Sequence, residues 1–390
     1  MYSPGSARYS PDKRIVMKGA SLGGAFEWTL EGVKPNHKEA WKIMLHAGLD
    51  LSRRRLDVCL LGADGSRLQE LQVPPDRDGL RWLALSIYDR HGQQPVQAAI
   101  ESMTGARFVH DQLELAGWEV EIADAVKAKG LAPLACKTDR VDAWVLAELS
   151  RRDLVPAIWL PDPSQRAERE RARWRLHLVK HRSALKNRIG STLMTFGHPR
   201  AMSDLFGLRG RQLLEAIELP QPWRGDVAAA VELIDDLDRR IDECAAELQR
   251  LGADHPYVPL LLTLPGVAWV LAYTIAAEIG DIHRFGSATK LCGYTGLCPR
   301  VRQSGEHDER GPLAKNGPRY LRWALIEAAR HAARTPYFRA KYERTCQRLG
   351  KRGTKIGAVE IARQLAQAIW HMLTRNQPFA PAGAPLPLVA

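Results

Sequence analysis

The chain has 390 residues, of which 45% are hydrophobic and 26% are charged. These values are typical of a globular protein, so they exclude a wholly disordered chain, and the length predicts two or three domains. The 56 Lys and Arg residues outnumber the 44 Asp and Glu residues, which gives a formal net charge of +12. This excess predicts a polyanionic partner, with nucleic acid ahead of an anionic membrane surface.

Two further features concern the compartment. The six cysteines lie far apart without a C-x-x-C pair, which argues against a zinc site or a disulfide framework and favours a reducing cytoplasm. The first 20 residues lack the apolar core of a signal peptide. One apolar run, residues 260–277, is about as long as a membrane span, but Pro265-Gly266 predicts a turn that enters a buried helix. We therefore expect no membrane partner.

The first 160 residues divide into two parts. Residues 1–43 are rich in Gly, Ser and Pro, so we expect a poorly ordered extension or a start codon assigned too far upstream. Residues 44–160 predict one α/β domain. Their pattern gives strands over 45–51 and 55–73, the latter broken by a hairpin turn at 63–66, then a helix, strand, helix, strand and helix over 78–88, 96–102, 107–116, 118–124 and 138–155. This order is typical of a mixed α/β sheet.

Residues 161–256 predict a helical linker. The stretch 164–190 holds nine Lys or Arg against two Glu, within a long helix over 164–196. A second helix carries apolar residues at strict three-four spacing: Val227, Ala230, Ile234, Leu237, Ile241, Cys244, Leu248 and Leu251. We expect this seam to fold back on the first helix, with coiled-coil pairing between chains as the alternative.

Residues 257–376 predict a second, mainly helical domain, followed by a disordered Pro/Ala-rich tail over 377–390. The stretch 300–355 holds fifteen basic against five acidic residues. Positive charge is therefore concentrated in the linker and the C-terminal domain, away from the N-terminal sheet.

Four carboxylates of the first domain stand out by position. Asp50 and Glu101 each end an apolar strand, whereas Asp139 and Asp142 share one face of a helix that Thr138 can cap. If these four converge, their repulsion must be relieved by protonation or by a divalent metal, and oxygen ligands suit Mg²⁺ or Mn²⁺. A single such acid is more often a cap or a salt-bridge partner, and we interpret four others in this way: Asp57, Asp64, Glu121 and Asp124.

The segments GLDLSRRRLDVCLL, AIES and KTDRVDAWVLAEL resemble the RuvC-like, DEDD-type domain of insertion-sequence transposases of family one-ten. The resemblance implies a ribonuclease-H-like fold in which Asp50, Glu101, Asp139 and Asp142 form the metal-binding quartet. One departure from the family pattern follows Glu101, where Ser102-Met103 precede Thr104-Gly105.

The C-terminal domain carries a matching second module. The turn at 264–267 resembles that of a helix-hairpin-helix, which can present N–H groups to phosphate, although a buried helical hairpin is the simpler interpretation. Beyond it, the family motif matches in order at Tyr294, Gly296, Leu297, Pro299, Ser304, Gly305, Lys315, Gly317 and Arg322. The resemblance gives Ser304 the role of nucleophile. Phosphate or nucleic-acid contacts are expected from Arg300, Arg302, Arg310, Lys315, Arg319 and Arg322, and from Arg173 and Lys180 of the linker.

The resemblance implies a DNA recombinase that moves its own insertion element through a covalent phosphoserine, assisted by magnesium. It also implies a structured guide RNA, a homodimer or tetramer, and a bacterial cytoplasmic, nucleoid-associated location. Serine and carboxylates could combine within one chain or between subunits.

Three other functions remain open at this point. A RuvC-like endonuclease would use the quartet alone and hydrolyse DNA with water. A sugar-kinase or actin-like ATPase also begins with an Asp on a first strand and a hairpin, but Leu51-Ser52-Arg53 offers little for phosphate. A non-catalytic nucleic-acid-binding protein would bind without a covalent product.

Overall fold

The computed structural model describes residues 44–131, 139–198, 204–304 and 307–380, together with two short strands near the N-terminus. These strands, β1 (Lys13–Val16) and β2 (Thr29–Gly32), pair antiparallel. The rest of the expected extension 1–43, and residues 381–390 of the expected tail, lie outside the described residues. The chain forms two compact units, Met1–Leu160 and Pro161–Ala390, and each is considered separately below.

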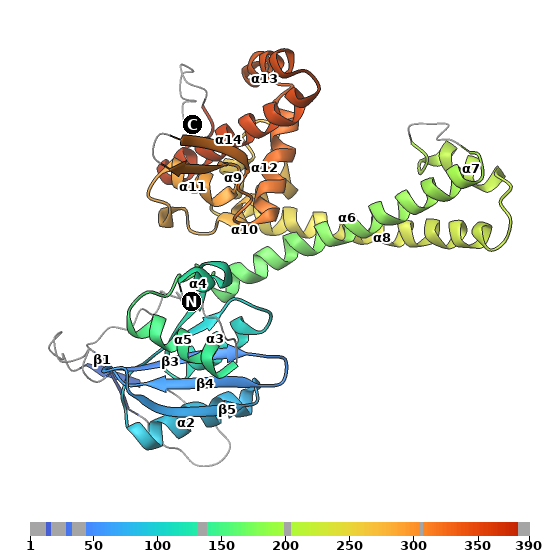
Figure 1. The fold of residues 1–390 in the computed structure, drawn as a ribbon. Helices are drawn as coiled ribbons and strands as arrows, with labels where there is room; N and C mark the ends of the chain where they lie inside the picture. The colour runs from blue at the N-terminus through green and yellow to red at the C-terminus, as the bar shows by residue number, and fades with distance from the viewer. Residues whose placement is uncertain are drawn as a thin grey trace. The chain divides into compact units, whose positions relative to one another are not determined.

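The first unit is built on a five-stranded mixed sheet (Figure 1). Its strands are β3 (Leu45–Leu51), β4 (Leu56–Leu61), β5 (Arg67–Val73), β6 (Val96–Glu101) and β7 (Glu119–Ala123). Their order is β5-β4-β3-β6-β7, so the first strand of the sheet is central. The first three strands are antiparallel neighbours, whereas β6 pairs parallel with β3 and β7 parallel with β6. The predicted mixed α/β sheet is confirmed.

The turn between β4 and β5 is the predicted one. The N–H of Gly62 donates to the carbonyl of Ser66 at 3.0 Å, and Asp64 accepts hydrogen bonds from the backbone and hydroxyl of Ser66. Gly65 has φ +85°, a conformation that favours glycine, so the chain can reverse direction here. Asp64 therefore serves the turn, as predicted.

The two faces of the sheet carry different helices. Alternate residues of β3, β4 and β6 pack with α2 (Arg77–His91) and α3 (Ala106–Leu115) in one hydrophobic core. The intervening residues face α5 (Asp139–Arg151), which packs against β3, β4 and β6. A short helix that the sequence did not predict, α4 (Ala125–Leu131), follows β7, and Asp124 accepts hydrogen bonds from two of its N–H groups. Asp124 is thus the cap that was predicted.

The second unit begins with two long helices that lie side by side (Figure 1). They are α6 (Pro163–Thr195) and α8 (Trp223–Ala253), joined through α7 (Leu208–Ala216). Asp162 caps α6 by accepting from the N–H of Gln165 at 2.9 Å. The seam of α8 packs on α6, so the predicted fold-back within the chain is confirmed. Ion pairs join the two helices at Arg171–Glu247, Arg182–Asp238 and Arg188–Asp226.

The rest of the second unit is mainly helical, as predicted. Its helices are α9 (Val258–Leu261), α10 (Trp269–Ile279), α11 (Ala288–Thr295), α12 (Arg319–Ala332), α13 (Pro336–Leu349) and α14 (Gly353–Arg375), with single turns of 3₁₀ helix at Ile282–Arg284 and Gly350–Arg352. They enclose one hydrophobic core. The apolar run 260–277 enters a buried helix, as expected, and no helix in the described part of the chain has the length and hydropathy to cross a bilayer.

The turn before α10 packs directly on α12. Gly266 has φ +81°, and a Cβ there would lie 2.3 Å from the carbonyl oxygen of Ala328. Only glycine allows this approach. The buried helical hairpin is therefore the arrangement that the structure contains at 264–267.

Candidate functional site

Two predicted carboxylates lie side by side at one edge of the sheet. The parallel register pairs Leu49 of β3 with Ile100 of β6, so Asp50 and Glu101 follow at the same level on strands about 4.8 Å apart. Side chains alternate along a strand, and Leu49 and Ile100 belong to the core with α2 and α3. Asp50 and Glu101 therefore point to the opposite face, the one covered by α5, and both are half-buried.

Helix α5 brings the other two predicted carboxylates to the same edge. A Cβ on Gly48 would lie 1.8 Å from the carbonyl oxygen of Ala143, so the backbone of α5 rests directly on β3. At the other end of this contact, His46 Nδ1 and Ser150 Oγ are 3.3 Å apart. Helix and strand thus run in opposite directions, and the residues that precede Ala143 extend past Gly48 towards the end of β3.

This orientation places the start of α5 beside Asp50. Asp142 is half-buried and directly precedes Ala143, and Asp139 begins the helix almost one turn earlier. The side chain of Asp139 and the whole of its predicted cap, Thr138, lie outside the described residues. The fold therefore brings Asp50, Glu101 and Asp142 to one edge and directs the first turn of α5 to the same place.

The donor set fits a hard divalent cation. Carboxylate oxygens are the ligands that Mg²⁺ and Mn²⁺ prefer, and here they come from two strands and a helix whose backbones are packed together. Among the side chains that the structure describes, no group of three His, Cys, Asp or Glu residues is close enough to hold one ion. Asp50, Glu101 and Asp142 are among those side chains, so they share this edge of the sheet without forming a site for one ion, and the side chain of Asp139 lies outside the described residues.

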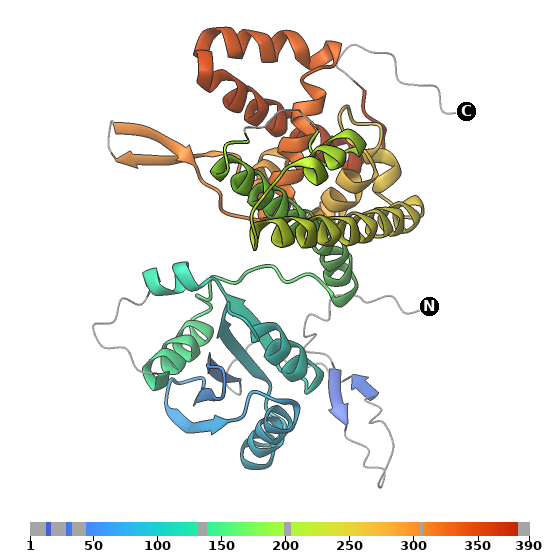
Figure 2. The ribbon, with the colours of Figure 1, turned by 90° about the vertical axis from the view of Figure 1, so that its right-hand side faces the viewer.

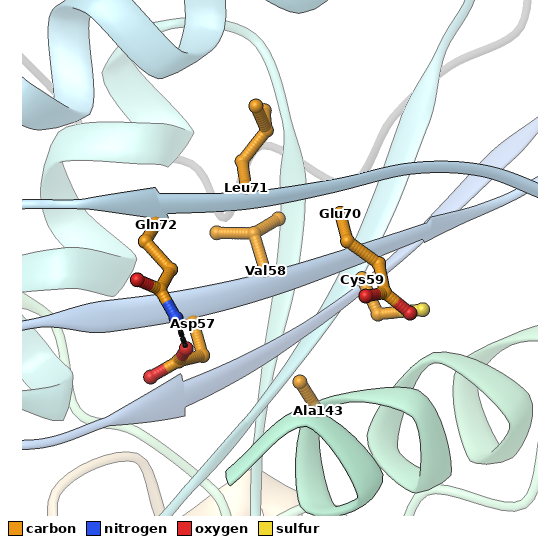
Figure 3. Close-up of a pocket in the computed structure, with 7 residues that line it drawn as sticks. All are labelled: Asp57, Val58, Cys59, Glu70, Leu71, Gln72 and Ala143. Carbon is orange, nitrogen blue, oxygen red and sulfur yellow. Dashed lines mark hydrogen bonds between the residues drawn. The ribbon is translucent and has the colours of Figure 1, made fainter.

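A neighbouring carboxylate on the same face has a different role. Asp57 pairs with Asp50 in the antiparallel register of β4 and β3 but is only 3% exposed. Its Oδ2 accepts from Arg55 Nε at 2.7 Å and its Oδ1 from Gln72 Nε2 at 2.8 Å. Figure 3 shows Asp57 and Gln72 at the wall of a pocket of about 300 Å³ that Ala143 of α5 also lines. Because both oxygens are occupied, Asp57 is the salt-bridge partner that was predicted.

Ser304 lies on a feature that the sequence did not predict, a β-hairpin. Strands β8 (Pro299–Ser304) and β9 (His307–Leu313) pair antiparallel, with Ser304 opposite His307. Figure 2 shows the pair as an orange arm that extends away from the helices of its own unit. The structure describes Ser304, Arg302 and Arg310 through their backbones alone. The strands lack an apolar alternation, since Val301 is exposed and its neighbours are polar, so hydrophobic periodicity gave no signal.

The other motif residues of this module build the base of the hairpin. Lys315 donates its N–H to the carbonyl of Gly296 at 3.1 Å. A Cβ on Gly317, whose φ is +107°, would lie 2.0 Å from the carbonyl oxygen of Tyr294. Arg322 Nη1 donates to the carbonyl of Thr295 at 3.2 Å, and burial lowers the pKa of its guanidinium. The motif thus ties the ends of β8 and β9 to α11 and α12.

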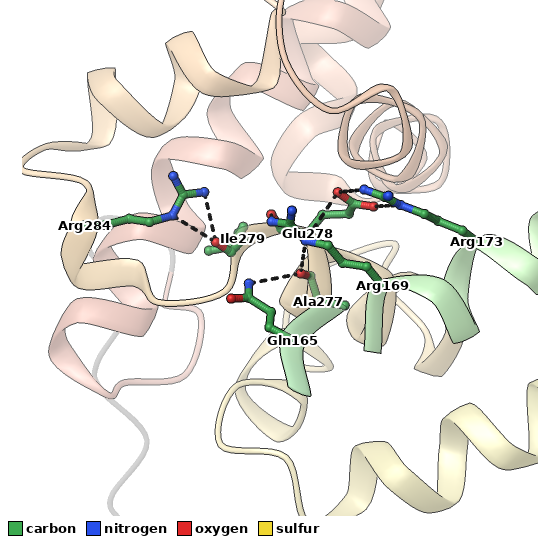
Figure 4. A network of polar contacts seen from close by, with 7 residues as sticks. All are labelled: Gln165, Arg169, Arg173, Ala277, Glu278, Ile279 and Arg284. Carbon is green, nitrogen blue, oxygen red and sulfur yellow. Dashed lines mark hydrogen bonds and ion pairs between the residues drawn. The ribbon is translucent and has the colours of Figure 1, made fainter. Parts of the chain in front are cut away.

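The predicted nucleic-acid contacts divide into two groups. Arg300, Lys315 and Arg319 near the hairpin, and Lys180 on α6, are exposed. Arg173 instead makes a two-pronged ion pair with Glu278, a fully buried residue, at 2.7 and 2.9 Å (Figure 4). Burial alone would lower the pKa of Arg173, but hydrogen bonding to Glu278 and the charge of that carboxylate raise it overall.

The same network closes the C-terminal end of α10. Arg169 donates to the carbonyls of Ala277 and Glu278 at 2.9 and 2.6 Å, and Arg284 donates twice to that of Ile279 (Figure 4). Cations at this end complement the helix dipole and satisfy carbonyls that the helix leaves open. Arg173 therefore joins α6 to α10, a structural contact that the basic sequence pattern did not reveal.

Both halves of the chain match models of known protein families. Residues 47–197 match a DEDD-type IS110 domain described as "Transposase", and residues 258–343 match one described as "Transposase IS116/IS110/IS902 family".

Curated relatives cover most of the chain. The transposase for insertion sequence element IS1111A of Coxiella burnetii is 28% identical over 62% of this chain and 68% of its own length. The transposase for IS1328 of Yersinia enterocolitica is 26% identical over 73% and 86% of the two lengths. A pilin gene-inverting protein of Moraxella bovis is 25% identical over 86% and 97%. With both of its domains matched in order, the chain belongs to the IS110 family of insertion-sequence transposases.

Proposed function

We propose that this protein is a DNA recombinase that cuts and rejoins the ends of an insertion element and its target through a covalent bond to Ser304. The observation that supports this most directly is the edge of the sheet where Asp50, Glu101 and the start of α5 meet. A basic C-terminal unit with a serine at the end of a hairpin supplies the second half of the chemistry.

The first unit is a ribonuclease-H-like domain in this proposal. Its support is the topology. Strand β3 is central, with the antiparallel β4 and β5 on one side of it and the parallel β6 and β7 on the other, and α5 lies across one face. In this arrangement the carboxyl ends of β3 and β6 lie at the same edge. The functional carboxylates are there, while the structural Asp57 is tied to Arg55 and Gln72.

Asp50, Glu101, Asp139 and Asp142 would hold Mg²⁺ or Mn²⁺. When bound, such an ion polarises a phosphodiester and stabilises the charge of the leaving oxygen. The chain itself contributes placement, because α5 rests directly on β3 at Gly48 and buries Ala143 and Ala147 against the sheet. Preorganised groups cost little reorganisation during the reaction.

Ser304 would act as the nucleophile. Its Oγ–P bond forms as the P–O ester bond breaks, the hydroxyl proton leaves the serine, and the departing sugar oxygen takes up a proton. The ester conserves the energy of the broken bond, so a DNA hydroxyl can later displace the serine and rejoin the strands. Arg300, Arg302 and Arg310 on the same hairpin would contact the phosphates around the reacting one.

Guide RNA and assembly complete the proposal. A structured RNA encoded by the element would select donor and target by base pairing, while the protein reads RNA shape and backbone. A dimer or tetramer would allow Ser304 of one subunit to act with carboxylates of another. Alternatively, Ser304 and the carboxylates of the same chain would combine.

The decisive experiment uses labelled DNA that spans the element ends, together with the adjacent noncoding RNA. The expected product is a protein–DNA adduct that survives denaturation and maps to Ser304 by mass spectrometry. Ser304→Ala should remove the adduct and strand cleavage together. If that variant still cleaves, a water-dependent RuvC-like nuclease is the correct function; if neither protein cleaves under any metal condition, the chain binds nucleic acid without catalysis.

A further inference from the structure

One face of α6 presents a row of aromatic rings to solvent. Trp174, His177 and His181 follow one another at three- and four-residue spacing, which places them on one side of the helix. All three are exposed, and the exposed fraction of Trp174 is 51%. We call these three residues, together with the exposed Lys180, which lies between His177 and His181 in the sequence, the aromatic face.

The rings of this face are ordered against one another. Trp174 and His177 are stacked, with centroids 5.9 Å apart and planes 12° from parallel. His177 and His181 meet edge to face at 4.6 Å. Each ring thus limits the rotation of the next, so a planar ligand would meet a surface that has already lost much of its side-chain entropy.

These rings do not belong to a core. Other sides of α6 carry its buried residues, which include Ala172, Leu178, Ile189 and Leu193. Its arginines at 171, 182 and 188 pair with carboxylates of α8. The aromatic face therefore lies beside the α6–α8 contact rather than in it.

The charge around the aromatic face favours a polyanion. From Arg171 to His198 the sequence contains no Asp or Glu, whereas α8 contains eight acidic residues against four arginines. Positive potential is thus concentrated on α6 and negative potential on α8. A nucleic acid strand would be attracted to the outer side of α6 and repelled by α8.

We propose that the aromatic face binds unpaired DNA bases by stacking, with Lys180 contacting the phosphates of the same strand. A base offers its flat surface to a protein ring only when the duplex is open, because paired bases already stack on their neighbours. The inference rests on the proposed function, since strand exchange is what creates unpaired DNA. It adds a site for the displaced strand on a helix that carries neither Ser304 nor the four carboxylates.

Binding measured by fluorescence anisotropy on the full-length protein tests this. The probes are a labelled oligothymidylate, a blunt DNA duplex of equal length and an oligouridylate. Trp174→Ala should weaken oligothymidylate binding about 10-fold, as expected for the loss of one stacked base, and leave duplex binding almost unchanged. Trp174→Phe should restore most of the affinity, and Lys180→Ala should weaken every probe and reduce the salt dependence.

The matched control is Trp82→Ala on α2. Trp82 is 54% exposed, so the two truncations remove equal surface and should not unfold the protein. A strand carrying 5-iododeoxyuridine should crosslink to the peptide that contains Trp174 and His177. The proposal is overturned if Trp174→Ala and Trp82→Ala bind oligothymidylate equally, if duplex binding falls as much, or if only oligouridylate binding falls.

A change in oligomeric mass without a change in DNA affinity would also overturn it and would identify a contact between copies. None of these measurements needs strand cleavage. A missing adduct at Ser304 would therefore contradict the proposed recombinase, whereas a binding curve that does not depend on Trp174 would contradict this inference and leave the recombinase standing.

Discussion

The carboxylate edge and the Ser304 hairpin are held in place by different means. At the edge, two backbones touch through Gly48 and Ala143, and a hydrophobic core fixes the strands from the other face. The hairpin is a two-stranded arm whose order depends on its base, because an isolated pair of strands is only marginally stable in water. In the proposed reaction, the strands and helix that carry the carboxylates are therefore held by packing, whereas the nucleophile is delivered on an arm.

The largest expected effect is on DNA cleavage, and it distinguishes Asp50 from Asp57, two carboxylates on one face of the sheet. Asp50→Asn should lower strand cleavage by about 1,000-fold or more, because a metal ion contributes several kcal/mol to the transition state. Asp57→Asn, directly opposite in the register, should retain most of the cleavage, since its oxygens serve Arg55 and Gln72. Cleavage of labelled DNA at saturating Mg²⁺ measures both. Equal losses in the two variants would contradict the assignment.

The next effect concerns the second unit alone. Glu278→Ala leaves the buried Arg169 and the half-buried Arg173 without their carboxylate and should lower the free energy of unfolding by about 3–5 kcal/mol. Hydrogen exchange on the full chain should report the loss in residues 161–390, with the sheet of the first unit unchanged. Glu243→Ala removes an exposed ion pair with Arg239 and should cost less than about 1 kcal/mol.

A smaller effect tests the contact that positions α5. Gly48→Ala puts a Cβ 1.8 Å from the carbonyl oxygen of Ala143, so α5 must shift, at a cost of about 1–3 kcal/mol. Cleavage should fall with stability, because Asp139 and Asp142 move with the helix. Gly130→Ala, where no atom lies within 4 Å of the new Cβ, is the control. Wild-type melting and activity in Gly48→Ala would show that this contact is not needed.

The smallest effect is on pH dependence. Burial lowers the pKa of His46 from its ordinary 6.5, with a further contribution from the charge of Arg151. The unfolded chain therefore binds a proton that the folded chain resists, so stability falls as the pH drops below about 6.5. The protection of β3 and α5 amides against hydrogen exchange, measured relative to the intrinsic exchange rate at each pH, should fall as the pH is lowered from about 7.5 to about 5.5.

His46→Gln should flatten that pH dependence, whereas His110→Gln on the partly exposed side of α3 should keep it. An identical pH profile in wild type and His46→Gln would assign the change to another group. Desolvation also lowers the pKa of the half-buried His255 in the second unit, so exchange must be followed separately in the two units.

Much of the fold could be predicted from periodicity and turn residues. The alternating strands, the Asp64-Gly65 turn and the seam of α8 each repeat with the period of their own secondary structure, which depends on local geometry alone. The hairpin at 299–313 could not be predicted in this way, because its sequence carries no apolar alternation and none of its described side chains is buried. Helix α4 was missed for a related reason, being one short segment with one buried residue, Ala128.

The candidate site shows the same division. The family motifs predicted roles for Asp50, Asp142 and Ser304 by order along the chain. They did not distinguish an arginine that binds DNA from one that holds the protein together, since Arg173 and Lys180 belong to the same basic stretch. Only the packing of α10 against α6 gives Arg173 a buried carboxylate and leaves Lys180 exposed.

By itself, the sequence determined the types and order of the first unit's elements apart from α4, the basic character of the second unit and the motifs of the family, because each depends on neighbours along the chain. The tertiary structure alone decided that Asp50 and Glu101 lie in register, that Gly48 admits α5, and that Asp57 is tied to Arg55 and Gln72. Strand register and backbone contact join residues far apart in sequence, and no local pattern records which of them will meet.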